Sequence, residues 1–507
     1  MTGVAQSALR RRLLWLEIPL IVLALVLFYL VTDRKDLGYA AGVLGGIGVL
    51  ALTFFRPKYG ILCLMALLFT ESTINVINAL ADTAEENNLT GVPMLVQTQW
   101  FAWGVLIIYL VLALSYFCRE LLRDRAIPPL TALEWVLLLP LLAVLVYLPI
   151  SLLVGNQFSD YMMDIIPQCI FAGIVVLARV LYREDEDGRN TRYFILDWFI
   201  IGNLVILVPL WGYNLAFEPW RNGYVGIAAI RYGTGPYDFN FFLVPLLGMV
   251  LVYDEEMLPG RRKFYQFALL LSLARVGVSM FRGAIGGTII AIIIATMLVG
   301  AGRRWKWIKD LLIFVGVMAL IATILILSVP VVRTTFDVAL VKRITQALNV
   351  GAGGTSLHFR ELETQEALEN IAKEPIIGYG PGSLISKNFN PRKPARFELY
   401  LHSGYVWYWY KLGLLGIGVV ITLLAGIYWN CIVLLRRKLF PADRGWVIGT
   451  LAATLAMVPV IHYNNMLIRS QGAYALTLLL FGLSMIVMRY RSVPGDQLPE
   501  IKGAESR

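Results

Sequence analysis

His402–Leu435 reads HSGYVWYWYKLGLLGIGVVITLLAGIYWNCIVLL, a histidine and a serine followed by a long apolar, aromatic-rich run. The run from Gly404 to Leu435 exceeds the roughly 20 residues that a helix needs to cross the hydrocarbon core of a bilayer. Only helices and closed barrels satisfy their backbone polar groups in lipid, and alternating ten-residue barrel patterns are absent from the sequence. The run therefore predicts a membrane-spanning helix, long enough to tilt or to begin outside the bilayer, with a titratable imidazole before it.

The rest of the chain has the same character. Of its 507 residues, 58% are hydrophobic and 15% are charged, and the mean hydropathy is +0.69, which excludes an ordinary soluble enzyme. The predicted fold class is all-α: a polytopic integral membrane protein of about 12–14 transmembrane helices with one large exoplasmic loop that contains helices. The first apolar run, Leu14–Val31, follows Arg10–Arg12 but lacks a small-residue cleavage site, which predicts a retained helix.

Lysines and arginines collect in alternate connections, and this asymmetry predicts the orientation. The positive-inside rule assigns the basic connections, the N-terminus and the C-terminal tail to the cytoplasm. The net charge of +10 is explained by this bias and by whatever the exposed face binds, so no nucleic-acid partner is expected. Two long connections on the opposite side, Ala216–Asn240 and Pro330–Leu401, also carry arginines, and these arginines require a partner.

The predicted boundaries divide the chain into five parts. They are N-terminal transmembrane helices (1–192), central transmembrane helices with arginine-bearing exoplasmic turns (193–329), a large exoplasmic loop (330–403), C-terminal transmembrane helices (404–489) and a cytoplasmic tail (490–507). The four cysteines show no metal-ligand spacing, and none falls in a long polar loop, so redox chemistry is not expected.

The large loop carries a predicted amphipathic helix. In RELETQEALENIAK, Leu362, Leu368 and Ile371 recur near helical spacing, and Pro375 with the turn GYGPGS ends the pattern. No strand precedes this glycine-rich turn and no helix follows it at once, so we interpret it as a structural turn rather than a dinucleotide site.

Four candidate functional residues lie on the exoplasmic side of the predicted topology: Arg231, Arg282, Arg360 and His402. A guanidinium stays charged and offers a planar fork to phosphate oxygens, so several arginines around one pocket suit a pyrophosphate leaving group. The helix N-terminus near Ser403 would add backbone N–H donors. A neutral imidazole beside them can take a proton from an attacking sugar hydroxyl.

Each candidate also has a structural interpretation. His402 can be an interfacial polar residue, and Arg360 can pair with a nearby glutamate such as Glu363. Arg275, deeper in the ninth predicted span, is either a second phosphate ligand or a structural charge held by an acid such as Glu71. The aromatic residues that begin with Tyr405 form an interface belt or stack on sugar faces. His358 is expected at the surface, and His462 is expected to cap the thirteenth span.

At these positions the sequence resembles the O-antigen ligase and O-antigen polymerase superfamily, membrane glycosyltransferases of the GT-C kind. The ligase signature is a histidine followed by Asn, Ser or Gln, then nine residues, then Gly-x-x-Gly. It is met by His402, Ser403, the nine residues Gly404–Leu412, Gly413 and Gly416. The segment RYGTGPYDFN at Arg231, the turn at Arg282 and EPIIGYGPGS strengthen the match, which extends from near Ile200 to Leu435.

The resemblance implies an inverting transfer from an undecaprenyl-pyrophosphate-linked glycan at the periplasmic face of the bacterial inner membrane, without metal or cofactor. It assigns pyrophosphate binding to Arg231 and Arg282, a contact with pyrophosphate or acceptor to Arg360, and the orientation or deprotonation of the acceptor hydroxyl to His402. The chain departs from the family where Phe281 precedes Arg282 in place of the usual serine, which keeps Arg275 as an alternative. The predicted span number also exceeds the twelve usual for the ligases.

The branches of this superfamily differ in the acceptor. A ligase uses a lipid A-core sugar, a polymerase uses another lipid-linked repeat unit, and a protein O-oligosaccharyltransferase uses Ser or Thr. The fit to the ligase spacing favours a ligase. A transporter would place ionisable groups or broken helices near the membrane midplane, and a scaffold would leave the arginines and His402 without a purpose, so both are weaker alternatives.

Overall fold

The computed structural model describes residues 45–46, 48–67, 69–70, 99–122, 128–182, 189–208, 237–278, 282–328, 356–387, 396–462, 465, 467 and 470–492. The chain forms two compact units: Met1–Leu67 with Trp103–Ile127, and Leu68–Ala102 with Pro128–Arg507.

The smaller unit contains most of α4 (Gln99–Leu122) and the apolar helix Pro57–Leu67. Two side chains of α4 bind carbonyl oxygens at the end of the preceding helical segment. Ser115 Oγ donates to Phe54 O at 2.6 Å, and Arg119 Nη2 donates to Phe55 O at 2.8 Å. Carbonyl groups that a helix end leaves without partners are thereby satisfied.

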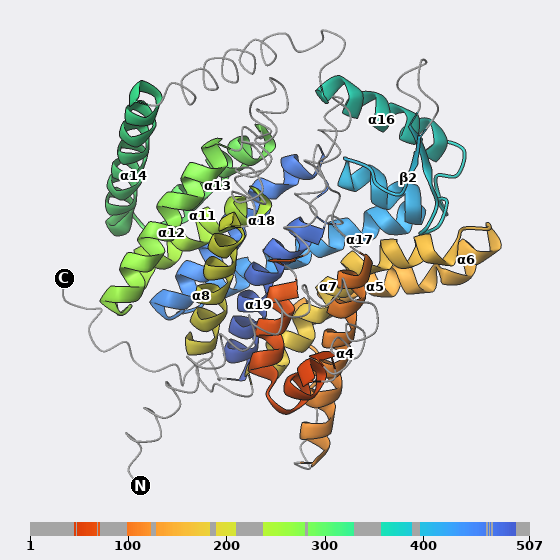
Figure 1. The fold of residues 1–507 in the computed structure, drawn as a ribbon, viewed down its shortest axis with the longest axis horizontal. Coiled ribbons are helices and arrows are strands. Elements are labelled where there is room, and N and C mark those ends of the chain that lie inside the picture. The colour runs from red at the N-terminus through yellow and green to blue at the C-terminus, as the bar shows by residue number, and fades with distance from the viewer. Residues whose placement is uncertain are drawn as a thin grey trace. The chain divides into compact units, whose positions relative to one another are not determined.

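The larger unit is built from long helices that pack in two groups (Figure 1). In one group, α11 (Tyr237–Tyr253), α12 (Pro259–Val278), α13 (Arg282–Leu298) and α18 (Pro441–Ile461) lie against one another. In the other, α5 (Ala132–Val146), α7 (Phe158–Tyr182), α17 (Gly404–Leu435) and α19 (Ser470–Ser492) do so. Among the described residues, this unit also contains α6 (Leu148–Leu153), α8 (Arg189–Val205), α14 (Ala301–Ser328) and the loop helix α16 (Ser356–Ile371).

Four stretches among the described residues are long and apolar enough to cross a membrane: Ala132–Leu153, Phe158–Tyr182, Gly404–Leu435 and Pro441–Ile461. The predicted all-α, polytopic membrane class is confirmed. The span predicted from His402 onward has the bounds that the sequence indicated, since α17 runs from Gly404 to Leu435.

A buried cluster joins α11, α13, α14 and α18 in the larger unit. Trp307 of α14 is 1% exposed, and it packs with Met249 and Val252 of α11 and Ala452 of α18. Gly248 permits this approach, because a Cβ atom there would lie 2.6 Å from Trp307 Cη2. Small residues at helix crossings of this kind let large aromatic side chains fill the core.

The large loop contains a helix, as predicted, and also a short hairpin. Helix α16 (Ser356–Ile371) includes the expected segment up to Ile371, two residues short of its predicted end at Lys373. The strands β1 (Ile385–Lys387) and β2 (Arg396–Glu398) pair antiparallel, with Ile385 opposite Glu398. The sequence analysis predicted only helices in this loop, because three-residue strands are too short to show a period-2 pattern.

The buried face of α16 differs from the predicted face. Glu363, Ala367 and Ile371 are 2%, 0% and 2% exposed, whereas Leu368 is 40% exposed. The spacing of four residues places the three buried side chains on one stripe of the helix. The prediction that Leu368 belongs to the apolar face was wrong, because a carboxylate occupies that face in place of a leucine.

Candidate functional site

The start of α17 explains why serine and glycine follow His402. Ser403 is the N-cap residue, and its Oγ accepts a hydrogen bond from the Val406 N–H at 3.5 Å. Gly404 lies so close to the end of α18 that a Cβ atom would meet Ile461 Cγ2 at 2.5 Å. The pair therefore caps the helix and permits the approach of its neighbour.

Two side chains fix the backbone that leads into His402. Asn465 Nδ2 donates to Leu401 O at 3.1 Å, and Trp407 Nε1 donates to Leu399 O at 3.1 Å. Trp407 belongs to α17 and Asn465 lies between α18 and α19, so His402 is held by a supported segment rather than by a free loop.

His402 forms a close pair with Glu363 of α16. Its Nδ1 lies 2.6 Å from Glu363 Oε2, and its backbone N–H donates to the same oxygen at 3.2 Å. The Glu363 side chain is 3% exposed and the His402 side chain 34% exposed. The ring of Tyr400 meets the imidazole edge-on at 5.1 Å. A buried carboxylate thus orients a ring that a solute can reach.

Arg360 belongs to the same helix as Glu363. It is half-buried and lies three residues before Glu363, which places both side chains on neighbouring positions of one helical face. The contact of α16 with α17 places the helix that carries Arg360 against the helix that follows His402.

The GYGPGS turn, residues 378–383, packs against α17 and supports this site. Gly378, Gly380 and Gly382 all have positive φ values. The chain here passes against a break in α17, where Gly413 has φ 58° and ψ −146°. A structural role was the prediction for this turn, and its position confirms it.

Backbone hydrogen bonds join the turn to the break. Tyr379 N–H donates to Tyr410 O at 2.9 Å, Gly380 N–H donates to Lys411 O at 2.9 Å, and Leu414 N–H donates to Ile376 O at 3.1 Å. At Gly413 the regular backbone hydrogen bonds of α17 are interrupted, and backbone groups of the turn form hydrogen bonds in their place. The Gly-x-x-Gly part of the signature is explained by close approach, because a Cβ atom at Gly413 would lie 2.0 Å from Ile376 O, and one at Gly416 would lie 2.0 Å from Tyr408 O.

A buried ion pair lies beneath the turn. Lys411 Nζ of α17 is 2.8 Å from Asp164 Oδ2 of α7, and the two side chains are 0% and 6% exposed. Lys411 also donates to Ser383 O, and the Gly382 N–H donates to Asp164 Oδ2 at 2.7 Å. The pair therefore joins two membrane helices to the turn.

A tyrosine completes the contact between turn and helix. Tyr379 stacks on Tyr410 with ring centroids 4.7 Å apart, and its hydroxyl donates to Asn370 O at 2.9 Å. Burial raises the pKa of Tyr379, and the nearby Glu374 carboxylate raises it further. The hydroxyl accordingly remains a donor to the end of α16.

The other predicted site residues have different outcomes. Arg231 lies outside the described residues, as does Glu71. Arg282 is the first residue of α13, which agrees with the predicted turn between two spans, but its side chain is outside the described part. Arg275 is 4% exposed in α12, and its Nη1 donates to Asn203 O of α8 at 2.8 Å. That bond supports a structural use of Arg275.

Tyr405 and His462 have structural contacts. The Tyr405 hydroxyl donates to Val458 O of α18 at 2.9 Å. His462 is the C-cap residue of α18, which confirms the predicted capping position. His358 is half-buried on α16. Among the described residues, no group of three or more His, Cys, Asp or Glu side chains is arranged to hold a metal ion.

The sequence analysis missed the partner of His402. Glu363 entered it only as one acid that Arg360 can pair with, although its spacing from Ala367 and Ile371 indicated a buried position. It also missed Lys411, where an ionisable residue inside an apolar span was the available signal. The acid that pairs with Lys411 carried no local signal, because Asp164 is remote in the sequence.

The comparison with known families concerns the region that contains these elements. Residues 267–421 match the family model described as O-antigen ligase. The match includes His402, Glu363, Arg360, Arg282 and Arg275. No curated protein matches the chain.

Members of the matched family are glycosyltransferase-like enzymes of the ligase and polymerase type, which use lipid-linked glycans in a membrane. The helices of this chain and the position of the match agree with such a membrane protein of polysaccharide biosynthesis. Through residues 267–421, the chain is similar to the O-antigen ligase superfamily.

Proposed function

We propose that this protein is an O-antigen ligase-like glycosyltransferase that moves a glycan from undecaprenyl pyrophosphate to a hydroxyl of a lipid A-core sugar. The proposed reaction takes place at the periplasmic face of the bacterial inner membrane, inverts the anomeric carbon and needs no metal ion. The observation that carries the proposal is the pairing of His402 with the buried Glu363 inside the matched domain.

The pair suits a general base. An ionised Glu363 carboxylate can only accept hydrogen bonds, so His402 Nδ1 carries the proton and Nε2 keeps a lone pair. In the proposed step, Nε2 takes the proton of the acceptor hydroxyl while the hydroxyl oxygen bonds to the anomeric carbon. The bond from that carbon to the pyrophosphate oxygen breaks, and its electron pair leaves with undecaprenyl pyrophosphate. One direct displacement inverts the configuration.

The pyrophosphate leaving group is an anion, so positively charged side chains are needed to stabilise it. We assign pyrophosphate binding to Arg231 and Arg282, with Arg360 contacting the pyrophosphate or the acceptor. Arginine forks match two phosphate oxygens at once and remain charged throughout the reaction. The half-buried position of Arg360 on the face of α16 that carries Glu363 supports its assignment.

Two alternatives share this donor chemistry. A polymerase would join lipid-linked repeat units, and a protein O-oligosaccharyltransferase would use a Ser or Thr hydroxyl. A transporter is less well supported, because the His402–Glu363 pair lies at a helix end beside a loop helix rather than within a span.

The test is glycan transfer by the purified full-length protein in lipid nanodiscs. An undecaprenyl-pyrophosphate-linked glycan is the donor, and lipid A-core or a second lipid-linked repeat is offered as acceptor, with and without EDTA. We expect transfer to lipid A-core that survives EDTA and is lost in His402→Ala. Equal transfer by wild type and His402→Ala would refute the assigned base, and transfer only to the second repeat would identify a polymerase.

A further inference from the structure

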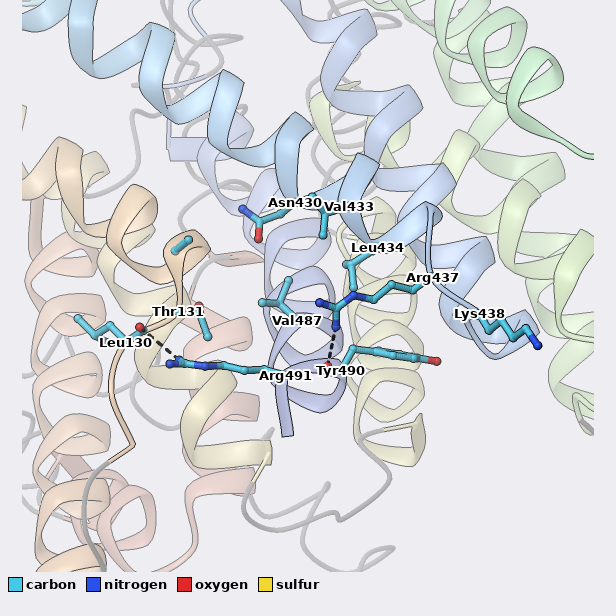
Figure 2. Close-up of a pocket in the computed structure, with 11 residues that line it drawn as sticks. Leu130, Thr131, Asn430, Val433, Leu434, Arg437, Lys438, Val487, Tyr490 and Arg491 are labelled. Carbon is cyan, nitrogen blue, oxygen red and sulfur yellow. Dashed lines mark hydrogen bonds between the residues drawn. The ribbon is translucent and has the colours of Figure 1, made fainter. Parts of the chain in front are cut away.

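A second site lies at the other end of α17. A cavity of about 720 Å³ lies between the start of α5, the last turn of α17 and the last turn of α19. Figure 2 shows the side chains that line it. Its lining combines apolar, polar and basic side chains, and the described residues that line it include neither aspartate nor glutamate. Because α17 has 32 residues, roughly 48 Å of helix separates this end from His402.

The charged part of the lining is basic. Arg437 and Lys438 follow α17, and Arg491 lies in the last turn of α19. Glu134, which caps α5 beside the cavity, is buried and paired with Arg179 at 2.6 Å. Its charge is therefore already matched, and the cavity keeps a positive potential.

The two arginines are held in place and retain free donors. Arg437 Nη1 donates to Tyr490 O at 2.7 Å, and Arg491 Nη1 donates to Pro129 O at 3.0 Å and to Leu130 O at 3.3 Å (Figure 2). A guanidinium carries five N–H donors. Within the described part of the chain, each of these arginines uses only Nη1, so Nε and Nη2 remain available to a ligand.

Much of the remaining lining is apolar, beside the polar side chains of Thr131, Asn430 and Tyr490. Val433 and Leu434 come from α17 and Val487 comes from α19, and both α17 and the stretch that begins at Ala132 are long enough to cross a bilayer. A cavity with fixed cations at a helix end and apolar walls toward the span fits an amphiphile. Basic pockets between transmembrane helices on the cytoplasmic side are suited to anionic lipid headgroups.

We propose that this cavity binds an anionic diacyl phospholipid. The headgroup phosphodiester contacts Arg437 and Arg491, and an acyl chain lies along Val433 and Val487. Charge complementarity and the apolar walls favour this ligand over a free phosphate ion, which gains nothing from the apolar side chains. The site is independent of the proposed glycan transfer.

Native mass spectrometry of the full-length protein in a neutral detergent tests the proposal. Phosphatidylglycerol and phosphatidylcholine with identical acyl chains are added separately, and inorganic phosphate is added as a competitor. We expect wild type to retain phosphatidylglycerol at least tenfold more strongly than phosphatidylcholine, and phosphate at the same concentration not to displace it. Equal retention of the two lipids, or displacement by phosphate, would overturn the proposal.

Two variants test whether the lipid binds in this cavity. The double substitution Arg437→Gln and Arg491→Gln should weaken phosphatidylglycerol retention at least tenfold. Val433→Trp, which keeps every charge but fills the cavity, should weaken it as well. The matched control is Arg304→Gln, because Arg304 Nη2 also binds a helix-end carbonyl, Val299 O at 3.2 Å, outside the cavity. If the control loses as much lipid as the double variant, or if both cavity variants retain it as wild type does, the assigned cavity is wrong.

Discussion

At the scale of single residues, we propose that Glu363 acts on glycan transfer through His402. Its oxygen contacts both the ring nitrogen and the backbone N–H of that residue. We expect Glu363→Gln to lower kcat about 10–100-fold, as loss of an orienting partner does, and to leave KM nearly unchanged. Steady-state transfer kinetics with varied acceptor measure the two constants separately.

The control for Glu363→Gln is Glu369→Gln, an exposed glutamate of the same helix. It should transfer at the wild-type rate. The pH profile adds a second readout, because a residue that only stabilises α16 would lower the amount of folded protein without changing the shape of the profile. An unchanged kcat in folded Glu363→Gln would contradict the positioning role.

The Lys411–Asp164 ion pair stabilises the packing of α7, α17 and the GYGPGS turn, and no contact with the acceptor is assigned to it. Removing one partner leaves a buried charge uncompensated, so Asp164→Asn or Lys411→Met should each lower the free energy of unfolding by about 3–5 kcal/mol. The double variant should recover part of that loss, because neither charge then remains. Thermal unfolding in detergent compares the four proteins, and additive losses in the double variant would contradict the pairing.

At the scale of elements, the break in α17 determines where the GYGPGS turn can bind. Gly413→Ala would place a Cβ atom 2.0 Å from Ile376 O at a φ of 58°. The backbone strain alone costs about 1–3 kcal/mol, and the clash adds to it. We expect a lower melting temperature and faster proteolysis between α16 and α17.

Gly418→Ala is the matched control in the same helix, because no atom lies within 4 Å of a Cβ atom built there. Its melting temperature should equal that of wild type. Equal behaviour of the Gly413 and Gly418 variants would show that the turn does not depend on the break.

The elements also show how far the sequence was informative. The bounds of α17, the helix in the loop and the role of GYGPGS as a turn follow from local patterns: an apolar run, a periodic segment and glycines beside a proline. The contacts that build the site do not follow from local patterns. Glu363 meets His402, and Asp164 meets Lys411, because separate helices pack together, and no local pattern specifies such packing. The hairpin was missed because its strands are too short to show a period.

At the scale of the whole molecule, α17 connects two proposed sites of different chemistry. His402 and the loop helix α16 lie at its N-terminal end, and the basic cavity lies at its C-terminal end. On the basis of the positive-inside rule, we propose that the second end faces the cytoplasm and the first end faces the periplasm. A transfer reaction at His402 requires that orientation, because its proposed substrates are presented on the outer face of the membrane.

The orientation predicts which residues a membrane-impermeant maleimide can reach. In a variant without the native cysteines (Cys63, Cys118, Cys169 and Cys431), Lys373→Cys after α16 and Arg436→Cys after α17 place one thiol at each end, both at exposed positions. We expect Lys373→Cys to react in cells with a permeable outer membrane but an intact inner membrane. Arg436→Cys should react only after the inner membrane is disrupted, and reaction of both after disruption is the control that both thiols are accessible. The reverse pattern would put His402 in the cytoplasm, where the proposed periplasmic transfer cannot occur.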